Sequence, residues 1–198
     1  MESNEPAYIL ATSGTTAKPK LVVHAHGGYQ VGIHSMGKWC FGLRDTDVWW
    51  STSDIGWVVG HSYIVYAPLL AGATTIAFEG AINHPTPDAI WQITDEFGVT
   101  GMFTSPTAVR LLMRYGDEGK PKTKLPSLER VFCAGEVLNP PAWDWLQNEA
   151  LEDRIPVIDH YWQTETGGPL VGNPYGLAML PSSPAPAERP CPASKPPS

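Results

Sequence analysis

The chain has 198 residues, of which 42% are hydrophobic and 17% charged, a composition typical of a globular protein with one sizeable domain or two small ones. Its net charge of −7 argues against a general nucleic-acid or anionic-membrane binder, because such proteins carry a basic excess. The three cysteines are far apart and follow no Cys-x-x-Cys spacing, so neither a disulfide framework nor a zinc site is expected.

The sequence shows no feature of secretion or membrane insertion. The N-terminal stretch MESNEPAYIL carries acidic residues where a secretory signal needs basic ones. The least polar stretch, Ile64 to Phe78, is shorter than the about 20 residues that span a bilayer. We therefore expect a soluble, cytoplasmic protein.

Short β-rich runs alternate along the chain with segments of helical length. The strand candidates, in chain order, are Tyr8–Ala11, Lys20–Val23, Val48–Ser51, Thr74–Phe78, Gly101–Phe103, Val131–Cys133 and Val157–Asp159. Helices are expected at Thr86–Phe97, at Pro106–Tyr115 and from Asn139 to near Asn148. This alternation predicts an α/β fold with a largely parallel sheet flanked by helices.

Several local features follow from these elements. Thr86 is expected to cap its helix, and Ala89, Ile90, Ile93 and Phe97 to share one apolar face. Trp49, Trp50 and Trp143 are expected to pack in the core. His24 and His26 lie along an apparent strand and should face opposite sides, which disfavours joint metal binding.

The composition changes at Pro181. The sequence from there, PSSPAPAERPCPASKPPS, is rich in proline, serine and alanine and shows no periodicity. Such a segment cannot bury enough surface to offset its ordering entropy. We therefore expect residues 1–180 to fold and residues 181–198 to form a disordered tail.

Polar stretches that follow strands are the first candidates for a site, because ligands of parallel sheets bind beyond the carboxyl ends of the strands. The stretch TSGTTAKPK, Thr12 to Lys20, offers backbone N–H groups, four hydroxyls and two lysines, which suit a polyphosphate. An ordinary Ser/Thr/Gly surface turn fits the same composition. The stretch lacks the spacing of a Walker A loop, so a P-loop NTPase is not expected.

Two further stretches follow later strands. Ala134–Val137 comes after Val131–Cys133, and His160–Gly168 comes after Val157–Asp159. The second combines aromatic faces, an amide, hydroxyls and a carboxylate, which suits stacking a base, contacting a phosphate and holding Mg²⁺. Taken alone, Glu165 also fits a solvated turn carboxylate.

Five motifs together carry a resemblance to a known family. They are TSGTTAKPK, DIGWVVGHSY (Asp54–Tyr63), APLLAGATTIAFEG (Ala67–Gly80), AGEVLNPPAW (Ala134–Trp143) and DHYWQTETGG (Asp159–Gly168). In order and spacing they closely resemble the acetyl-CoA synthetase branch of the AMP-forming acyl-CoA synthetases, from Tyr8 to about Leu180. The resemblance implies part of the large N-terminal AMP-binding (adenylation) domain of these enzymes.

The resemblance also implies an activity. Enzymes of this family couple a carboxylate to the α-phosphate of ATP, release diphosphate, and then pass the acyl group from AMP to coenzyme A. The implied small molecules are a short-chain carboxylate, ATP with Mg²⁺, and coenzyme A as co-substrate, with no nucleic-acid or membrane partner.

Site residues are assigned by the same resemblance. The residues implied to grip the β- and γ-phosphates are Thr12, Ser13, Gly14, Thr15, Thr16, Lys18 and Lys20. Those implied around the adenine and α-phosphate are Gly135, Glu136, Val137, Asp159, His160, Tyr161, Trp162, Gln163 and Thr164. The catalytic roles fall on Thr164 at the α-phosphate, Glu165 as the Mg²⁺ ligand, and Lys18. Val59, in place of a typical threonine, and Asn83 fall where the family contacts coenzyme A.

The implied acyl pocket is lined by Trp57, Val58, Ala134 and Trp162. The indole of Trp162 resembles the short-chain branch, because it would block a long alkyl tail. Ala134 stands where valine is common in enzymes for acetate and leaves space for about two carbons, each worth roughly 0.8 kcal/mol of burial. Propionate or butyrate is therefore expected to compete with acetate.

Some family features have no match. These are the Tyr-x-Thr-Gly-Asp ribose motif, the hinge and the C-terminal domain that carries the catalytic lysine. We expect that domain to be absent and the chain to be an incomplete fragment of weak or no activity. The alternatives are a non-catalytic nucleotide-binding remnant and another adenylating enzyme, such as an amino-acid activation domain.

Overall fold

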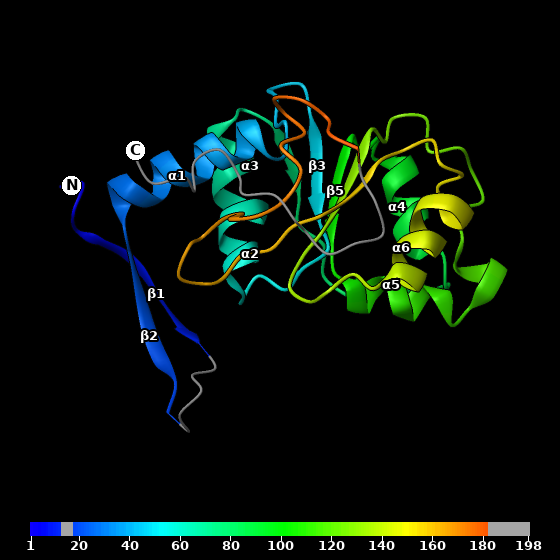
Figure 1. Cartoon of the computed structure of the whole chain (residues 1–198), viewed down its shortest axis with the longest axis horizontal. Helices are drawn as coiled ribbons and strands as arrows, with labels where there is room; N and C mark the ends of the chain where they lie inside the picture. The colour runs from blue at the N-terminus through cyan, green and yellow to red at the C-terminus, as the bar shows by residue number, and fades with distance from the viewer. Residues whose placement is uncertain (13–17, 182–198) are drawn as a thin grey trace.

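Five short parallel strands form the centre of the computed structural model, which describes residues 1–12 and 18–181 (Figure 1). In spatial order they are β4 (Thr74–Ile76), β3 (Val48–Ser51), β5 (Gly101–Thr104), β6 (Arg130–Cys133) and β7 (Val157–Asp159). All four neighbouring pairs run parallel. The predicted α/β fold with a largely parallel sheet is confirmed.

Helices cover both faces of this sheet (Figure 1). One face carries α1 (His26–Trp39), α2 (Val58–Gly60), the π-helical turn η1 (His61–Tyr66) and α3 (Ala67–Leu70). The other face carries α4 (Ala89–Glu96), α5 (Pro106–Met113), the 3-10 turn η2 (Gly116–Gly119), α6 (Pro140–Asp144) and the π-helical turn η3 (Trp145–Ala150).

The strands contribute side chains to two hydrophobic cores, because successive side chains of a strand point to opposite faces of the sheet. Trp49 and Phe132 pack with α1 in one core, whereas Trp50 and Val131 pack in the other, with α4, α5 and α6. All four side chains are fully buried. The expected burial of Trp49 and Trp50 is confirmed, and Trp143 packs partly buried against the second core.

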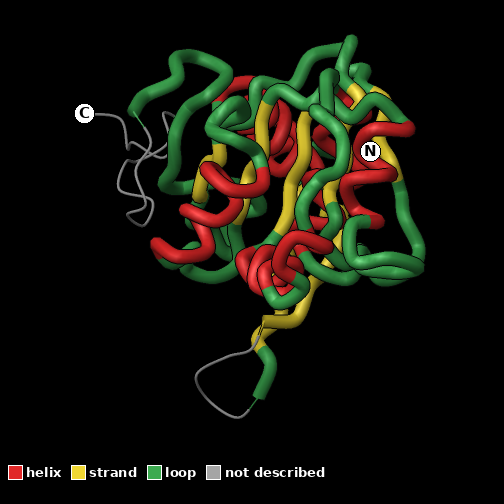
Figure 2. Tube along the Cα trace, turned by 90° about the vertical axis from the view of Figure 1, so that its right-hand side faces the viewer, coloured by secondary structure: helices red, strands yellow, loops and turns green. Residues whose placement is uncertain are grey.

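A separate antiparallel hairpin is formed by β1 (Pro6–Thr12) and β2 (Lys20–Ala25). It projects from the layered body (Figures 1 and 2). The first two strand candidates are therefore not part of the parallel sheet. The stretch from Thr12 to Lys20 joins the hairpin strands rather than following a strand of the central sheet, and its residues 13–17 lie outside the described part.

The start of α1 corrects a second expectation. His24 lies in β2, but His26 is the first residue of α1, so the two histidines do not alternate along one strand. The sequence of α1 contains Gly27, Gly28, Gly32 and Gly37, which weaken helix propensity. Packing of Tyr29, Ile33 and Met36 into the core stabilises the helix instead.

The helix α4 begins later than predicted, at Ala89, and Thr86 does not cap it. Thr86 precedes a proline, which disfavours helical backbone there, and its hydroxyl accepts a hydrogen bond from Gln92. The buried residues of the helix are Ala89, Ile90, Trp91 and Thr94. Phe97 follows the last helical residue, Glu96, and is 55% exposed, so it does not belong to the buried face. The predicted helices at Pro106 and Asn139 are confirmed.

Two further observations concern the described residues only. No helix within them combines the length and apolarity needed to cross a membrane. Cys40 and Cys133 are buried, whereas Cys191 lies outside the described part.

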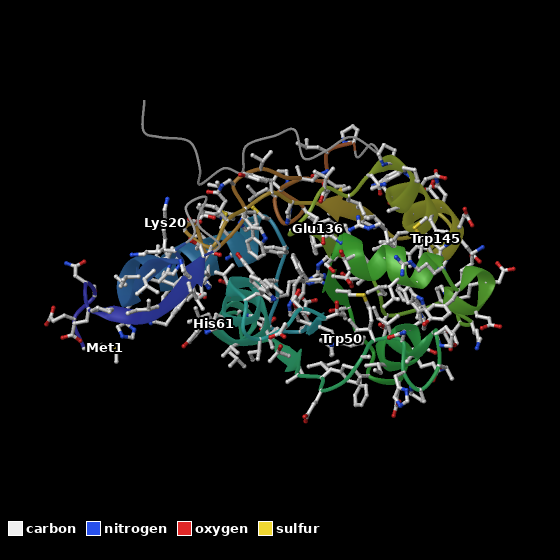
Figure 3. The ribbon with its side chains drawn as sticks, turned by 90° about the horizontal axis from the view of Figure 1, so that it is seen from below. Met1, Lys20, Trp50, His61, Glu136 and Trp145 are labelled. Carbon is white, nitrogen blue, oxygen red and sulfur yellow. The ribbon has the colours of Figure 1, made fainter. Side chains whose placement is uncertain are left out.

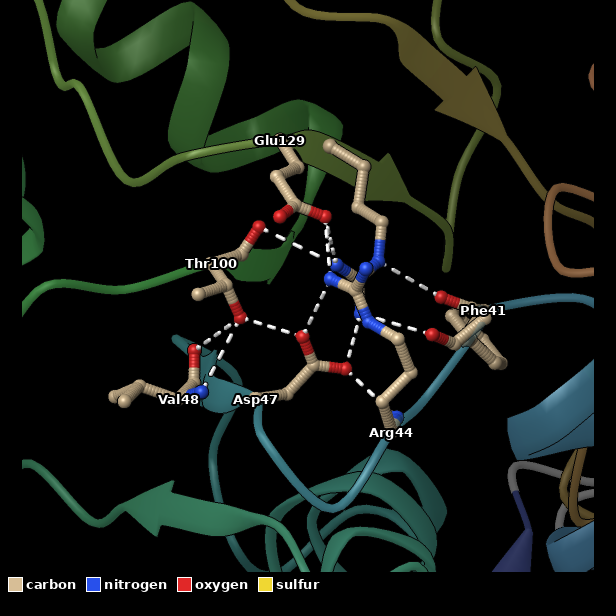
Figure 4. A network of polar contacts seen from close by, with 8 residues as sticks. Phe41, Arg44, Asp47, Val48, Thr100 and Glu129 are labelled. Atoms are coloured by element: carbon tan, nitrogen blue, oxygen red, sulfur yellow. Dashed lines mark hydrogen bonds and ion pairs between the residues drawn. The ribbon is translucent and has the colours of Figure 1, made fainter.

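The amino ends of three central strands are joined by a buried ion pair (Figure 4). Arg130, the first residue of β6, donates from Nη2 to Asp47 Oδ2 over 2.6 Å, and both side chains are inaccessible to solvent. The guanidinium also donates to the carbonyl oxygens of Phe41 and Gly42 over 2.9 and 3.1 Å. Thr100 donates to Asp47 Oδ1 over 2.7 Å.

Burial by itself would raise the pKa of Asp47. The hydrogen bond and charge of Arg130, with further hydrogen bonds from Thr100 and Arg44, outweigh burial and lower the pKa. Asp47 therefore contributes stability above the pKa of an unfolded aspartate, and this contribution is lost as the pH falls through the lowered value.

We predict that Arg130→Met lowers the free energy of unfolding by about 3–5 kcal/mol, because it leaves the carboxylate of Asp47 without its buried partner. Urea unfolding followed by tryptophan fluorescence measures this change. The matched control is Lys124→Ala, which breaks an exposed 2.7 Å ion pair with Glu152 and should cost less than about 1 kcal/mol. Equal losses in the two variants would contradict the prediction.

Candidate active site

A cavity of about 570 Å³ opens at the carboxyl ends of the central strands. Its lining residues come from the segments after β3, β5, β6 and β7, together with the start of α2. This is the edge at which open parallel sheets bind ligands. The volume lies in the range of small-molecule pockets, which is roughly 300–1,000 Å³.

The cavity gathers nine of the residues assigned from the sequence. They are Trp57, Val58, Val59, Ala134, Gly135, Glu136, Trp162, Gln163 and Thr164. These residues come from three stretches that are far apart in the chain. The structure thus brings the implied acyl pocket and much of the implied nucleotide site into one cavity.

The apolar part of the cavity is formed around Trp162. Its ring centroid lies 4.9 Å from that of Tyr63 and 5.6 Å from that of Phe103. Val58 and Ala134, both buried, line the same cavity. The indole of Trp162 therefore forms part of the wall of the cavity.

Glu136 stands at the polar side, on the segment after β6. Its carboxylate accepts a hydrogen bond from Thr107 and pairs with the guanidinium of Arg110, both on α5. The hydrogen bond from Thr107 and that from Arg110 lower the pKa of Glu136, so the carboxylate stays ionised at neutral pH. In Figure 3 Glu136 lies over the middle of the molecule, between the hairpin and α6.

The loop after β7 is closed on itself. Tyr161 and Val171 form an antiparallel bridge, with Tyr161 N–H donating to the Val171 carbonyl over 2.8 Å. Inside the loop, the backbone N–H of Gln163 donates to Thr166 Oγ1 over 3.2 Å. These bonds fix the segment that presents Trp162 and Thr164 to the cavity.

Nine other assigned residues are described but do not line this cavity: Thr12, Lys18, Lys20, Asn83, Val137, Asp159, His160, Tyr161 and Glu165. Lys20 lies on the hairpin and points outward (Figure 3). Asn83 donates to the hydroxyl of Tyr115 over 2.9 Å. Ser13, Gly14, Thr15 and Thr16 lie outside the described residues. The roles of these residues stay predictions.

Glu165 is exposed, and no group of three or more His, Cys, Asp or Glu side chains suited to a metal ion occurs among the described residues. Mg²⁺ is commonly held by one or two carboxylates together with substrate phosphates. A single carboxylate at position 165 fits that kind of coordination.

Four polar residues line the cavity but are not among the site residues assigned from the sequence. Thr52, Ser53 and Asp54 follow β3, and Ser105 follows β5, and all four line the cavity together with Phe103. Collecting polar residues after every strand, instead of after three of them, finds these four. Ser105 also accepts a hydrogen bond from Ala108 N–H over 3.2 Å and so caps α5.

A second cavity of about 610 Å³ adjoins the first. The two share Thr52, Ser53 and Asp54. The second continues along the segment from Ala77 to Gly80, which follows β4. Two adjoining cavities therefore lie along the carboxyl edge of the sheet.

The fold and the cavity define a class of protein, namely an open parallel α/β protein with a cavity of small-molecule size at the carboxyl edge of its sheet. The comparison with known proteins narrows this class. The family model described as AMP-binding enzyme matches residues 1–194, and the chain belongs to this family.

Similar proteins support this assignment. An acetyl-coenzyme A synthetase of Pyrobaculum aerophilum is 46% identical over 184 residues, which are 93% of this chain and 28% of that protein. Acetyl-coenzyme A synthetase 2 of Pseudomonas aeruginosa is also 46% identical, over 92% of this chain and 28% of that protein. The crystal structure of a Brucella canis acyl-CoA synthetase matches with a TM-score of 0.79 and 34% identity, over 92% of this chain and 32% of that one. The chain thus spans less than a third of each of these proteins.

His160 differs from its neighbours in the loop because it is buried away from the cavity. Its ring stacks on Phe132 at 5.3 Å, and its Nε2 lies 3.3 Å from the carbonyl oxygen of Asn173. A Cβ on Gly172 would lie 1.9 Å from His160 Cδ2, so only glycine fits there. Burial lowers the pKa of His160 to about 4, although the hydrogen bond with Asn173 opposes this effect.

We predict that the pKa of His160 makes stability depend on pH. The unfolded histidine binds a proton below about 6.5 and the folded one only below about 4, so stability is full above 6.5 and falls as the pH drops toward 4. The expected loss from this group is on the order of 3 kcal/mol. Urea unfolding at pH 7 and pH 4.5 measures it.

In the variant His160→Gln, the part of the pH dependence of stability that comes from His160 is expected to disappear. His34→Gln is the control, because His34 is exposed. This variant should show the same pH dependence of stability as the wild type. The same pH dependence in His160→Gln and in the wild type would contradict the role of His160.

Proposed function

We propose that this chain forms the acyl-adenylate-binding part of a short-chain carboxylate–CoA ligase (AMP-forming). In this reaction a carboxylate oxygen attacks the α-phosphorus of ATP and diphosphate leaves. The thiol sulfur of coenzyme A, after losing its proton, then attacks the acyl carbonyl carbon and AMP leaves. The single observation that carries the proposal is the gathering of nine assigned residues from three distant stretches in one cavity.

The acyl group is proposed to bind between Trp162, Val58 and Ala134. A bulky indole at the end of the pocket favours short chains. Ala134, which is buried, leaves more room than a larger side chain would. We therefore propose acetate or propionate as the carboxylate, with butyrate as a competitor.

The phosphates are proposed to bind at the polar side, near Thr164. The attack brings a carboxylate against an anionic phosphate, so positive charge must offset a repulsion that low dielectric strengthens. Lys18, Lys20 and Mg²⁺ on Glu165 would supply this charge when bound to the phosphates. Of these, Lys20 points outward on the hairpin (Figure 3). We therefore propose that this chain by itself binds ATP weakly and turns over slowly.

Coenzyme A is proposed to approach through the second cavity. That cavity shares Thr52, Ser53 and Asp54 with the first, so it lies beside the proposed acyl site. Val59 lines the first cavity with an apolar side chain. Residues 1–180 would belong to an adenylation domain that acts on small molecules in the cytoplasm. Residues 182–198, which make up nearly all of the expected tail, lie outside the described part.

A non-catalytic nucleotide-binding remnant is the second candidate function. It is favoured by the outward position of Lys20, which leaves the described cavity with little positive charge. Calorimetric titration with ATP·Mg²⁺ and with a non-hydrolysable acetyl-adenylate mimic tests the proposal. Micromolar binding of the mimic supports the ligase site, and binding of neither compound contradicts both functions. Binding of ATP·Mg²⁺ with no preference for the acylated mimic favours the remnant.

We predict that Trp162→Gly changes the preferred chain length of the acyl group. Each methylene that the enlarged pocket buries should strengthen binding about fourfold, from about 0.8 kcal/mol per CH₂. Calorimetry with acetyl-, butyryl- and hexanoyl-adenylate mimics measures this series. The matched control Trp143→Phe alters a tryptophan that packs on the other core and should keep the wild-type order. An unchanged preference in Trp162→Gly would contradict the proposed acyl pocket.

A further inference from the structure

The loop that carries Thr164 is held from outside by residues of the hairpin and of the helices on one face. His24 of β2 lies with Nε2 2.8 Å from the carbonyl oxygen of Thr164, across 140 residues of sequence. Because a carbonyl oxygen only accepts, Nε2 must carry the proton and donate. His24 is 9% exposed and is not among the residues that line the cavity.

The ring of His24 is fixed by neighbouring aromatic side chains. It stacks on Tyr8 of β1, with centroids 4.9 Å apart and planes inclined by 26°. Tyr8 also stacks on His61 at the start of η1, with centroids 5.0 Å apart. The hydrogen bond to Thr164 therefore starts from a side chain that is itself held in place.

The far end of the same turn is held in a similar way. Ser62 donates from Oγ to the carbonyl oxygen of Gly167 over 2.7 Å, and its Oγ lies 2.8 Å from the hydroxyl of Tyr29. Gly167 has φ +67°, and a Cβ there would lie 3.2 Å from the ring of Tyr29 and 3.5 Å from that of His24. The turn from Thr164 to Gly167 thus packs against the rings of His24 and Tyr29.

We propose that His24 is a positioning residue for the loop after β7, which carries Thr164 and Glu165. Its hydrogen bond fixes the peptide plane that joins Thr164 to Glu165, since the peptide group is rigid and planar. These two residues are the ones proposed for the α-phosphate and for Mg²⁺. The inference rests on the proposed function and adds a residue outside the cavity on which affinity depends.

Two substitutions separate the hydrogen bond from the ring packing. His24→Phe keeps an aromatic ring to stack on Tyr8 but removes the N–H donor. His24→Gln removes the ring but keeps an N–H donor of similar reach. His34→Phe is the control for an exposed histidine.

The first measurement needs no ligand. Hydrogen–deuterium exchange of the full chain should be faster in the loop at residues 164–168 in His24→Phe, and should return toward the wild-type rate in His24→Gln. Unchanged exchange of this loop in His24→Phe overturns the proposal. So does an equal acceleration throughout the chain, because that indicates a general loss of stability.

The second measurement is calorimetric titration with the acetyl-adenylate mimic. His24→Phe should bind about 5- to 10-fold more weakly than the wild type, in line with the loss of one hydrogen bond, and His24→Gln should recover most of the affinity. Equal affinities of wild type and His24→Phe overturn the proposal. If the wild type binds no mimic, the proposed function fails, whereas the exchange experiment still decides whether His24 holds the loop.

Discussion

The guanidinium of Arg130 lies completely inside the protein, and its 2.6 Å bond to Asp47 connects the amino ends of the central strands. Asp47 directly precedes β3, Thr100 directly precedes β5, and Arg130 begins β6, so one network holds three neighbouring strands (Figure 4). Breaking a buried pair leaves an uncompensated charge and is costly. The alignment of these strands at one edge thereby determines which residues meet at the other edge.

That other edge holds the cavity. The residues after β3, β5, β6 and β7 meet there because the four strands are parallel and in register. The apolar part comes from side chains that continue the core, such as Phe103 and Ala134. The polar part comes from loops that are fixed by residues outside the cavity. Arg110 forms an ion pair with Glu136, and His24 forms a hydrogen bond with the carbonyl oxygen of Thr164.

Much of this arrangement could be predicted from the sequence, because buried strands and the polar stretches after them are local patterns. All seven strand candidates exist, and nine assigned residues meet in one cavity. The helix α1 was missed because its stability comes from the packing of Tyr29 and Ile33 and not from propensity. The hairpin pairing of β1 with β2 and the bond between His24 and Thr164 depend on contacts distant in sequence, which no local pattern contains.

The proposed function requires that the residues following β6 and β7 form one acyl-adenylate site at the carboxyl edge of the sheet. The most direct measurement is a ¹H–¹⁵N NMR titration of the full chain with a non-hydrolysable acetyl-adenylate mimic. We expect the largest shifts at the amides of residues 134–136 and 162–164 and at the indole N–H of Trp162. Amides of η2, which does not line the cavity, should stay unchanged. Shifts that spare residues 134–136 and 162–164 at saturating mimic would rule out an acyl-adenylate site formed by these residues.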